Sequence, residues 1–575
     1  MQQLLAWVRR VVSIAIVPIL VVALTDFIVD QANPFGIGTA IEAAVARLIQ
    51  REAVALGISG GASPGQKVVT VVLINRDFIQ KFTHSDEATW PLPVSSLMRY
   101  VIRPVLNEKP AAVFIDLAFP KAPREITPGV NRAGEQGEQN AADYLADRLV
   151  EIDQDSTLPP VFLADVVVPT RDDDALKGSC DVSYVAEDKL VERSVMSREL
   201  RAKVFGSSQG ATRISLVDSG VLNAKGGYQL APIATGPSGS CGLQLEKGLN
   251  YIPSPAIALL RAYCPPTLQG GYRRRELCGR KPVQPLAASI MLGKERSPLG
   301  VRLYGLKKPA ARNVMELRWR TNLTPETRQA FEGVAGTDAC LAQFRYRTFE
   351  PLIIYAATLF KPLEEAFSTE LERPCMAIDT ITPADIHAEF KEGEGLAGRS
   401  FGGVFIRDRI VLIGVDLTQA GDTYESPTSG VIPGVYVHAT AIENLLTRGD
   451  TYSPAEPEPQ IIALLYLVSA IAVFILSWLW RKFLAIGQRR WPPIGELVLA
   501  PAAYLVVALL VSICLLFLFD VILPNVGMVL PLTKIALPIL AVHLVLFADW
   551  GERLRDCILR IALRRTSFDL ETKRR

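Results

Sequence analysis

Residues 68–74 read VVTVVLI, a nearly continuous run of β-branched and aliphatic side chains. Such a run is typical of a strand that is buried on both faces, as in a parallel sheet. Residues 93–107, PVSSLMRYVIRPVLN, place apolar side chains such as Leu97 and Val101 at helical spacing and predict an amphipathic helix. Residues 111–119, AAVFIDLAF, predict a second buried strand. Strand, helix and strand form a βαβ unit, which predicts parallel strands joined by a right-handed crossover.

The same alternation of helix and strand returns further along the chain. Residues 144–152 predict a helix and residues 161–168 a strand, and residues 409–414 predict a strand that is followed by a helix at 433–448. We therefore expect a three-layer α/β domain with a mainly parallel sheet, assembled from segments that are far apart in the chain. The stretch of about residues 170–350 is less regular, and we interpret it as an insertion that decorates the sheet.

Four long apolar runs near the two ends of the chain predict membrane-spanning helices. Each is long enough to cross about 30 Å of hydrocarbon. The first run could instead be a signal peptide, but acidic and bulky residues follow it where cleavage requires small ones, so we expect a retained anchor. The four spans, which we expect to form an α-helical transmembrane bundle, are residues 11–30, 460–480, 495–519 and 526–549.

The distribution of lysine and arginine predicts the orientation of these spans. Basic residues gather in 1–10, 481–494 and 550–575, whereas the short loop 520–525 has none, so both termini are expected in the cytoplasm. Residues 31–459 would then form an extracytoplasmic, periplasmic domain of a multi-pass protein in the bacterial cytoplasmic (inner) membrane, with membrane lipid as a partner. The formal net charge of only +2 argues against a nucleic-acid partner.

Cysteine usage agrees with an exterior location. Six of the eight cysteines lie in the proposed exterior domain, an even number that allows three disulfides in an oxidising compartment. The spacing does not determine which cysteines pair. The candidates are Cys180, Cys241, Cys264, Cys278, Cys340 and Cys375.

Six segments with specific wording occur in a fixed order: VVLINRDF (71–78), WPLP (90–93), AVFIDLAF (112–119), YIPSPAIALL (251–260), RIVLIG (409–414) and PGVYVHATAIENLL (433–446). Together they resemble the CHASE2 family of extracytoplasmic sensory domains from bacterial membrane receptors. The resemblance covers about residues 40–450, and it implies a sensor followed by three transmembrane helices. Family members often continue into a cyclase or kinase, and no such module follows the last span here. The resemblance therefore implies a separate cytoplasmic signalling partner, and its layout implies a homodimer.

Five side chains are candidates for a ligand site. Ligands of open parallel sheets bind beyond the carboxyl ends of the strands, and Asp77, Asp116 and Asp422 fall near or beyond such ends. Trp90 could form an apolar wall and His438 opens the last helical region, so the five could bind a cation or a small polar ligand. The alternative is structural: Asp77 and Asp116 cap helices or tie loops, and Trp90 and His438 are packed.

Catalytic motifs are weak in this sequence. Residues 57–61 and 206–210 fit the G-x-S-x-G pattern of serine hydrolases, but both follow helical or polar segments rather than a strand. The acidic run at 172–174 lacks the glycine and distal glutamate of a calcium-binding loop. We expect that the protein is not an enzyme and that it binds no cofactor or metal. The first hypothesis is a sensor subunit that binds an unknown extracytoplasmic ligand; the rivals are a structural or assembly protein that docks partners and, with least support, an exterior hydrolase.

Overall fold

The computed structural model describes the core of the central region. The chain divides into two compact units, Met1–Ser59 with Pro457–Arg575, and Gly60–Glu456, and every described residue belongs to the second. The four predicted membrane spans lie outside the described residues. Within the described part, no helix is both long and apolar enough to cross a membrane. The described residues are 63–83, 90–117, 141–165, 183–186, 200, 204, 213–218, 228–230, 233–236, 250–252, 254–265, 276–279, 314–315, 317–319, 377–386, 404–417, 422–426 and 430–449.

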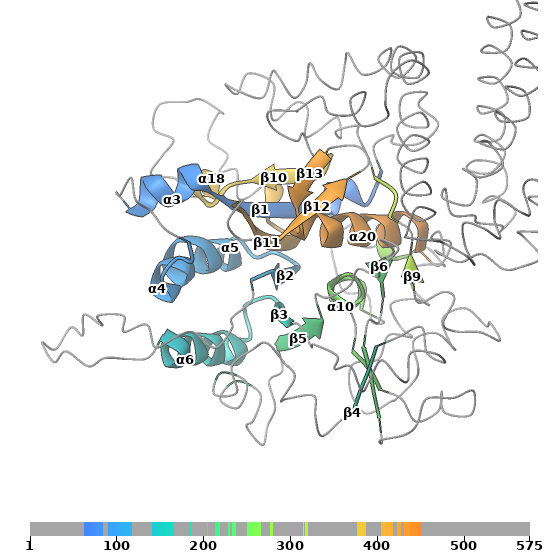
Figure 1. The fold of residues 1–575 in the computed structure, drawn as a ribbon, viewed down its shortest axis with the longest axis horizontal. Helices are drawn as coiled ribbons and strands as arrows, with labels where there is room; N and C mark the ends of the chain where they lie inside the picture. Colours follow the sequence, from blue (N-terminus) through green and yellow to red (C-terminus); the bar gives the residue numbers. More distant parts are fainter. Residues whose placement is uncertain are drawn as a thin grey trace, which may run out of the picture. The chain divides into compact units, whose positions relative to one another are not determined.

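A six-stranded sheet is the centre of the fold, and all its strands are parallel (Figure 1). The late strand β11 lies between the early strands β1 and β2, so the sheet joins segments about 300 residues apart in the sequence. The predicted parallel α/β sheet is confirmed. In spatial order the strands are β10 (Asp379–Ile381), β1 (Val69–Asn75), β11 (Ile410–Asp416), β2 (Ala112–Ile115), β3 (Val161–Asp165) and β5 (Ile214–Asp218).

Alternate side chains of each strand enter two separate apolar cores. In β1, Val71 packs into one core and Val72 into the other, and in β2 Phe114 and Ile115 divide in the same way. Because both faces are buried, the strands lack the polar alternation of a half-exposed sheet. The continuous apolar runs in the sequence follow directly from this burial.

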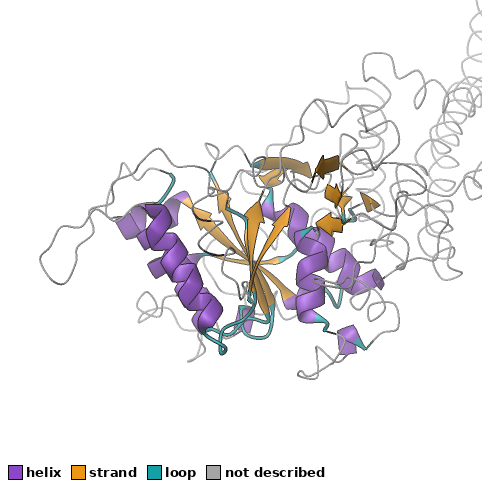
Figure 2. Cartoon of the chain, turned by 90° about the horizontal axis from the view of Figure 1, so that it is seen from below, coloured by secondary structure: helices purple, strands orange, loops and turns teal. Residues whose placement is uncertain are grey.

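Two layers of helices cover the sheet (Figure 2). One face packs against α10 (Pro255–Tyr263) and α20 (Val435–Arg448). The helices of the opposite layer are α3 (Arg76–Thr83), α4 (Val94–Leu97), α5 (Arg103–Asn107), α6 (Ala141–Gln154) and α18 (Pro383–Ile386). The described domain is therefore a three-layer α/β/α sandwich, as predicted.

The helix predicted over 93–107 is continuous but changes its winding. Between α4 and α5 lies a π-helical segment, η4 (Met98–Ile102), and the N–H of Arg103 bonds to the carbonyl oxygen of Met98, five residues back. Pro104 follows and has no N–H to donate, which removes one bond of the regular α-helical ladder. The local widening therefore occurs next to a proline that disfavours ordinary winding.

Two described elements of residues 170–350, the stretch interpreted as a decorating insertion, belong to the main core instead. Strand β5 completes one edge of the main sheet, and α10 covers one of its faces with every residue from Pro255 to Leu260 buried. These elements were missed as core because they are short and separated by irregular sequence. The other described strands of this stretch are β4 (Ser183–Ala186), β7 (Ile233–Gly236), β8 (Asn250–Ile252), β6 (Tyr228–Gln229) and β9 (Val314–Met315).

Helix α20 begins two residues later than predicted because a hairpin precedes it. Strands β12 (Thr423–Ser426) and β13 (Gly430–Pro433) pair antiparallel, and Pro433 belongs to the second. The helix then crosses β11 very closely: a β-carbon on Gly414 would lie 2.5 Å from Cβ of Val435. Only glycine allows this approach of helix and strand.

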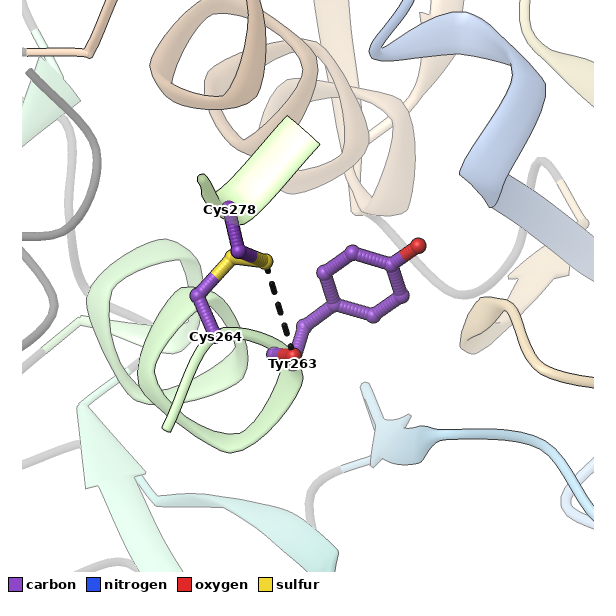
Figure 3. Close-up of a disulfide and its surroundings, with 3 residues drawn as sticks. All are labelled: Tyr263, Cys264 and Cys278. Carbon is purple, nitrogen blue, oxygen red and sulfur yellow. Dashed lines mark hydrogen bonds between the residues drawn. A yellow bond between two sulfur atoms is a disulfide. The ribbon is translucent and has the colours of Figure 1, made fainter. Parts of the chain in front are cut away.

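One disulfide joins Cys264 to Cys278, with their Cα atoms 5.3 Å apart (Figure 3). Both cysteines are buried, and Sγ of Cys278 also lies 3.7 Å from the carbonyl oxygen of Tyr263, the last residue of α10. The bridge therefore holds the end of α10 to the short segment 276–279. The other four candidate cysteines lie outside the described residues.

Candidate functional site

The candidate site lies where the connections of neighbouring strands diverge. The chain leaves β1 and β2 towards the layer of α3–α6, whereas it leaves the intervening β11 towards α20 on the opposite face. Such a point, at the carboxyl ends of parallel strands, is where ligands bind in doubly wound sheets. Asp116 directly follows β2, and Asp416 is the last residue of β11.

Asp116 and His438 approach each other at this edge. Asp116 Oδ2 lies 3.7 Å from Nε2 of His438, in the first turns of α20, and both side chains are almost completely buried. The distance is longer than a hydrogen bond. The imidazole packs edge-on against Phe114, with ring centroids 5.2 Å apart. Helix α20 and strand β2 thus bring together two polar groups that lie more than 300 residues apart in the chain.

Tyr228 connects this pair to the start of the second helix on the same face. Its hydroxyl lies 3.0 Å from Nδ1 of His438 and accepts a hydrogen bond from the N–H of Ala256, at 3.3 Å. Ala256 is in the first turn of α10, whose N-terminal N–H groups have no partner within the helix. Tyr228 therefore links the N-terminal turns of α10 and α20 through one buried hydroxyl group.

Asp422 completes the cluster from the loop before β12. Its carboxyl group lies against Gly434, where an added β-carbon would be 2.1 Å from Oδ1, and its carbonyl oxygen accepts a hydrogen bond from the Gly434 N–H at 2.9 Å. Although the residue as a whole is exposed, partial burial of the carboxyl group raises its pKa. Asp422 is thereby held beside the N-terminus of α20, where negative charge is favoured.

Burial and proximity shift the ionisation of the two innermost groups. The pKa of Asp116 is raised well above its usual value, first by burial and second by repulsion from Asp422. Burial lowers the pKa of His438 to about 3, so the imidazole is neutral near pH 7. The close approach of Asp116 and His438 is therefore a contact of polar groups and not an ion pair.

The remaining two candidates lie apart from this cluster. Trp90 packs against the opposite core, which is covered by α3–α6, so it does not form a wall beside His438. Asp77 is exposed in the first turn of α3, and within the described residues it has no hydrogen bond or ion pair. The structure thus brings together three of the five predicted residues: Asp116, Asp422 and His438.

The cluster combines hydrogen-bonding groups of several kinds. These are two carboxyls of raised pKa, a neutral imidazole and a hydroxyl, all supported by elements on one face of the sheet. Among the described residues, no group of three or more His, Cys, Asp or Glu side chains could hold a metal ion. Both G-x-S-x-G segments, the acidic run at 172–174, His84 and His387 lie outside the described residues.

Tyr228 was missed by sequence reasoning. It lies in the short segment GGYQL, residues 226–230, which has neither a clear helical nor a strand period. Ser254 and Pro255, residue types that are common at helix starts, stand at the beginning of α10. Nothing in the sequence connects that opening to a tyrosine 28 residues earlier.

Comparison with known proteins gives one match. A family model described as CHASE2 domain matches residues 42–479. The match covers most of the chain and includes every described element of the sheet and its helices. No curated protein and no solved structure matches the chain.

Proposed function

The chain belongs to the CHASE2 domain family, whose members are extracytoplasmic sensory domains, and from this premise we propose that it is a membrane-anchored sensor subunit. It binds a small polar ligand or a cation at the carboxyl edge of the sheet. It passes the change to a separate cytoplasmic signalling protein through its transmembrane helices. The proposal assigns it no catalytic role.

The convergence of Asp116, Asp422 and His438 carries this proposal. The loop after β2, the loop before β12 and helix α20 supply one residue each, and the three meet at the edge where the connection after β11 leaves towards the opposite face from those after β1 and β2. Buried carboxyl groups that repel each other bind a ligand that supplies positive charge or hydrogen bonds, because such a ligand offsets both burial and repulsion. A ligand bound there would contact the loop after β2, the loop before β12 and helix α20, and it could shift these elements relative to one another.

The membrane arrangement is supported by the sequence pattern. Four apolar runs with basic residues on one side predict a chain that crosses the bilayer four times with its sensory domain outside. A ligand shifts such a receptor only by its difference in affinity between two conformations. The signal would then pass to a separate cytoplasmic protein, and the basic segment 550–575, which the positive-inside rule places in the cytoplasm, offers a surface on which such a partner can dock.

Purification of the intact protein from native membranes tests the partner. Co-purification of a kinase, cyclase or other signalling enzyme is the expected result. The matched control is a chain with the basic residues of 550–575 changed to glutamine, which should lose the enzyme while keeping its place in the membrane. Recovery of envelope or transport components alone would instead support a docking or assembly protein and contradict the sensor.

Topology is tested separately with sealed spheroplasts. A protease added outside is expected to digest the region 31–459 and leave the terminal spans protected. Digestion only after the membrane is opened would place this region in the cytoplasm and overturn the proposed arrangement.

A further inference from the structure

Glu443 is a completely buried acidic residue on the same helix as His438, five residues further along the chain. Its residue exposure is 0%, and its carboxyl group accepts hydrogen bonds from Ser63 Oγ, from Thr447 Oγ1 at 2.9 Å and from Asn444 Nδ2 at 3.0 Å. The candidate site does not use this residue. A buried carboxyl group needs such partners, so the loss of any one hydrogen bond costs free energy because a polar atom is left without a partner.

The bond to Ser63 joins segments near the two ends of the compact unit Gly60–Glu456. Ser63 lies three residues after the start of this unit, and Glu443 lies 380 positions later in α20. Gly65 packs so closely on the helix that an added β-carbon would lie 2.7 Å from the Glu443 carbonyl oxygen and 2.8 Å from Thr447 Oγ1. The N-terminal segment of the unit, at residues 63–65, is therefore bonded and closely packed to helix α20, near the C-terminal end of the same unit.

Gln66 extends this fastening to a third segment. Its side chain donates to the carbonyl oxygen of Ala377 at 3.0 Å and accepts from the Ser63 N–H at 2.7 Å. The Gln66 N–H in turn donates to Ser63 Oγ at 3.2 Å. Ser63 is thus held in one geometry, with its hydroxyl between Gln66 and Glu443.

Helix α20 carries both the candidate-site residue His438 and Glu443, five residues further along. At a rise of about 1.5 Å per residue the two positions are about 8 Å apart along the helix axis. His438 lies beside Asp116 and Tyr228, and the carboxyl group of Glu443 bonds to Ser63 and Thr447. Val435 packs closely on Gly414 and the Glu443 carbonyl oxygen on Gly65, so the helix is held against neighbouring segments on both sides of His438.

We propose that α20 transmits structural changes at the carboxyl edge of the sheet to the N-terminal segment of the unit, residues 63–70, through the hydrogen bond between Glu443 and Ser63. This inference rests on the proposed sensory function and names the residues that couple its site to the connections with the rest of the chain. The bond is a discrete contact, either made or broken, and such contacts convert small helix shifts into two states.

Hydrogen exchange in the full-length protein, reconstituted in lipid nanodiscs, tests the coupling without a ligand or a partner. His438→Ala disturbs α20 at the candidate site, and the measured quantity is the resulting change in the hydrogen-exchange rate of residues 64–70. In the otherwise unchanged protein we expect an increase of about five- to tenfold, the change that the loss of roughly one hydrogen bond produces. In the Ser63→Ala background the added effect of His438→Ala should fall below about twofold.

Thr447→Val is the matched control, because it deletes a donor to the same carboxyl oxygen of Glu443 from within α20. It should leave the coupling intact, and Ser63→Thr, which keeps the hydroxyl, should restore it. Equal loss of coupling in Ser63→Ala and Thr447→Val would show a merely structural network and overturn the inference. No response of residues 64–70 to His438→Ala in the unchanged background would overturn it as well.

If Ser63→Ala prevents folding, Glu443→Gln takes its place. This change keeps the size of the side chain and replaces one acceptor oxygen by a donor. Persistence of the full coupling in Glu443→Gln would contradict the inference. Failure of the partner purification would contradict the sensory function but leave this coupling measurable. Loss of the coupling alone would leave the sensor standing with another route of transmission.

Discussion

His438 Nε2 lies 3.7 Å from Asp116 Oδ2, and neither side chain is more than 10% exposed. Burial lowers the pKa of His438 to about 3 and raises that of Asp116 well above its usual value, so burial favours the uncharged form of each group. Each group therefore makes the stability of the domain depend on pH, and in opposite directions.

Replacement of His438 by glutamine should flatten the acidic side of the stability profile. The folded-state pKa of about 3 lies below the unfolded value near 6.5. The contribution of His438 to the free energy of unfolding is therefore fully present above pH 6.5 and is lost as the pH falls towards 3. The loss amounts to about 5 kcal/mol at most, of which about 3 kcal/mol falls between pH 7 and pH 4. Urea unfolding of the full chain between pH 7 and 4 measures it, and an unchanged slope in the variant would show that His438 is not the titrating group.

Asp116→Asn should act on the other side of the profile. A raised folded-state pKa means that stability is fully present below the unfolded value near 3.8 and is lost as the pH rises through the folded value. The asparagine variant does not ionise and so lacks this loss. The difference in free energy of unfolding between the variant and the native protein should therefore favour the variant more at pH 7 than at pH 4. Asp422→Asn should move the native transition to lower pH, since repulsion from Asp422 is the second cause of the shift. A transition that stays in place in this variant would argue against the repulsion.

The buried pair of Arg409 and Asp379 should be strongly coupled. Arg409 Nη1 bonds to the Asp379 carboxylate, and the side chains are 8% and 1% exposed. Arg409→Met or Asp379→Asn alone leaves an uncompensated polar partner and should destabilise the domain by about 3–5 kcal/mol. The double variant should be less destabilised than the sum of the two, and a double-mutant cycle by urea unfolding measures this difference. Strict additivity would contradict the pairing.

Removal of the disulfide should lower stability without altering the site. Cys264 and Cys278 close a loop of 14 residues, and a loop of that length stabilises by about 3 kcal/mol at most in the chain-entropy description. Cys264→Ser with Cys278→Ser should therefore lower the melting temperature, and the reductant dithiothreitol should lower it in the native protein but not in this variant. Free alkylation of both thiols in the oxidised native protein would contradict the bridge.

Local patterns were sufficient to predict most of the main sheet. Residues 68–74 and 409–414 lack polar positions because both faces of their strands are covered, and that burial is visible as an uninterrupted apolar run. The short strand β5 and helix α10 were not assigned to the core, because a brief apolar segment fits several structures equally well. The membrane spans, the cytoplasmic partner and the homodimer stay predictions.

The site was predicted in part, and for a general reason. Asp116 and Asp422 were chosen because they follow strands, and strands of a parallel sheet end at one edge. Trp90 was grouped with them for its size, but which face of a sheet a loop residue packs against depends on the path of the connection. Tyr228 joined the cluster through contacts that no spacing in the chain reveals.

What the sequence alone determined is the family, the alternation of helices and strands, and the burial of the strands on both faces, since each depends on side chains that are near neighbours in the chain. Only the tertiary structure decided that β11 lies between β1 and β2, that Tyr228 and His438 share a hydrogen bond, and that Ser63 meets Glu443. These relationships depend on pairing between segments separated by hundreds of residues. Strand order and helix packing select such pairings over many others that the same local patterns would permit.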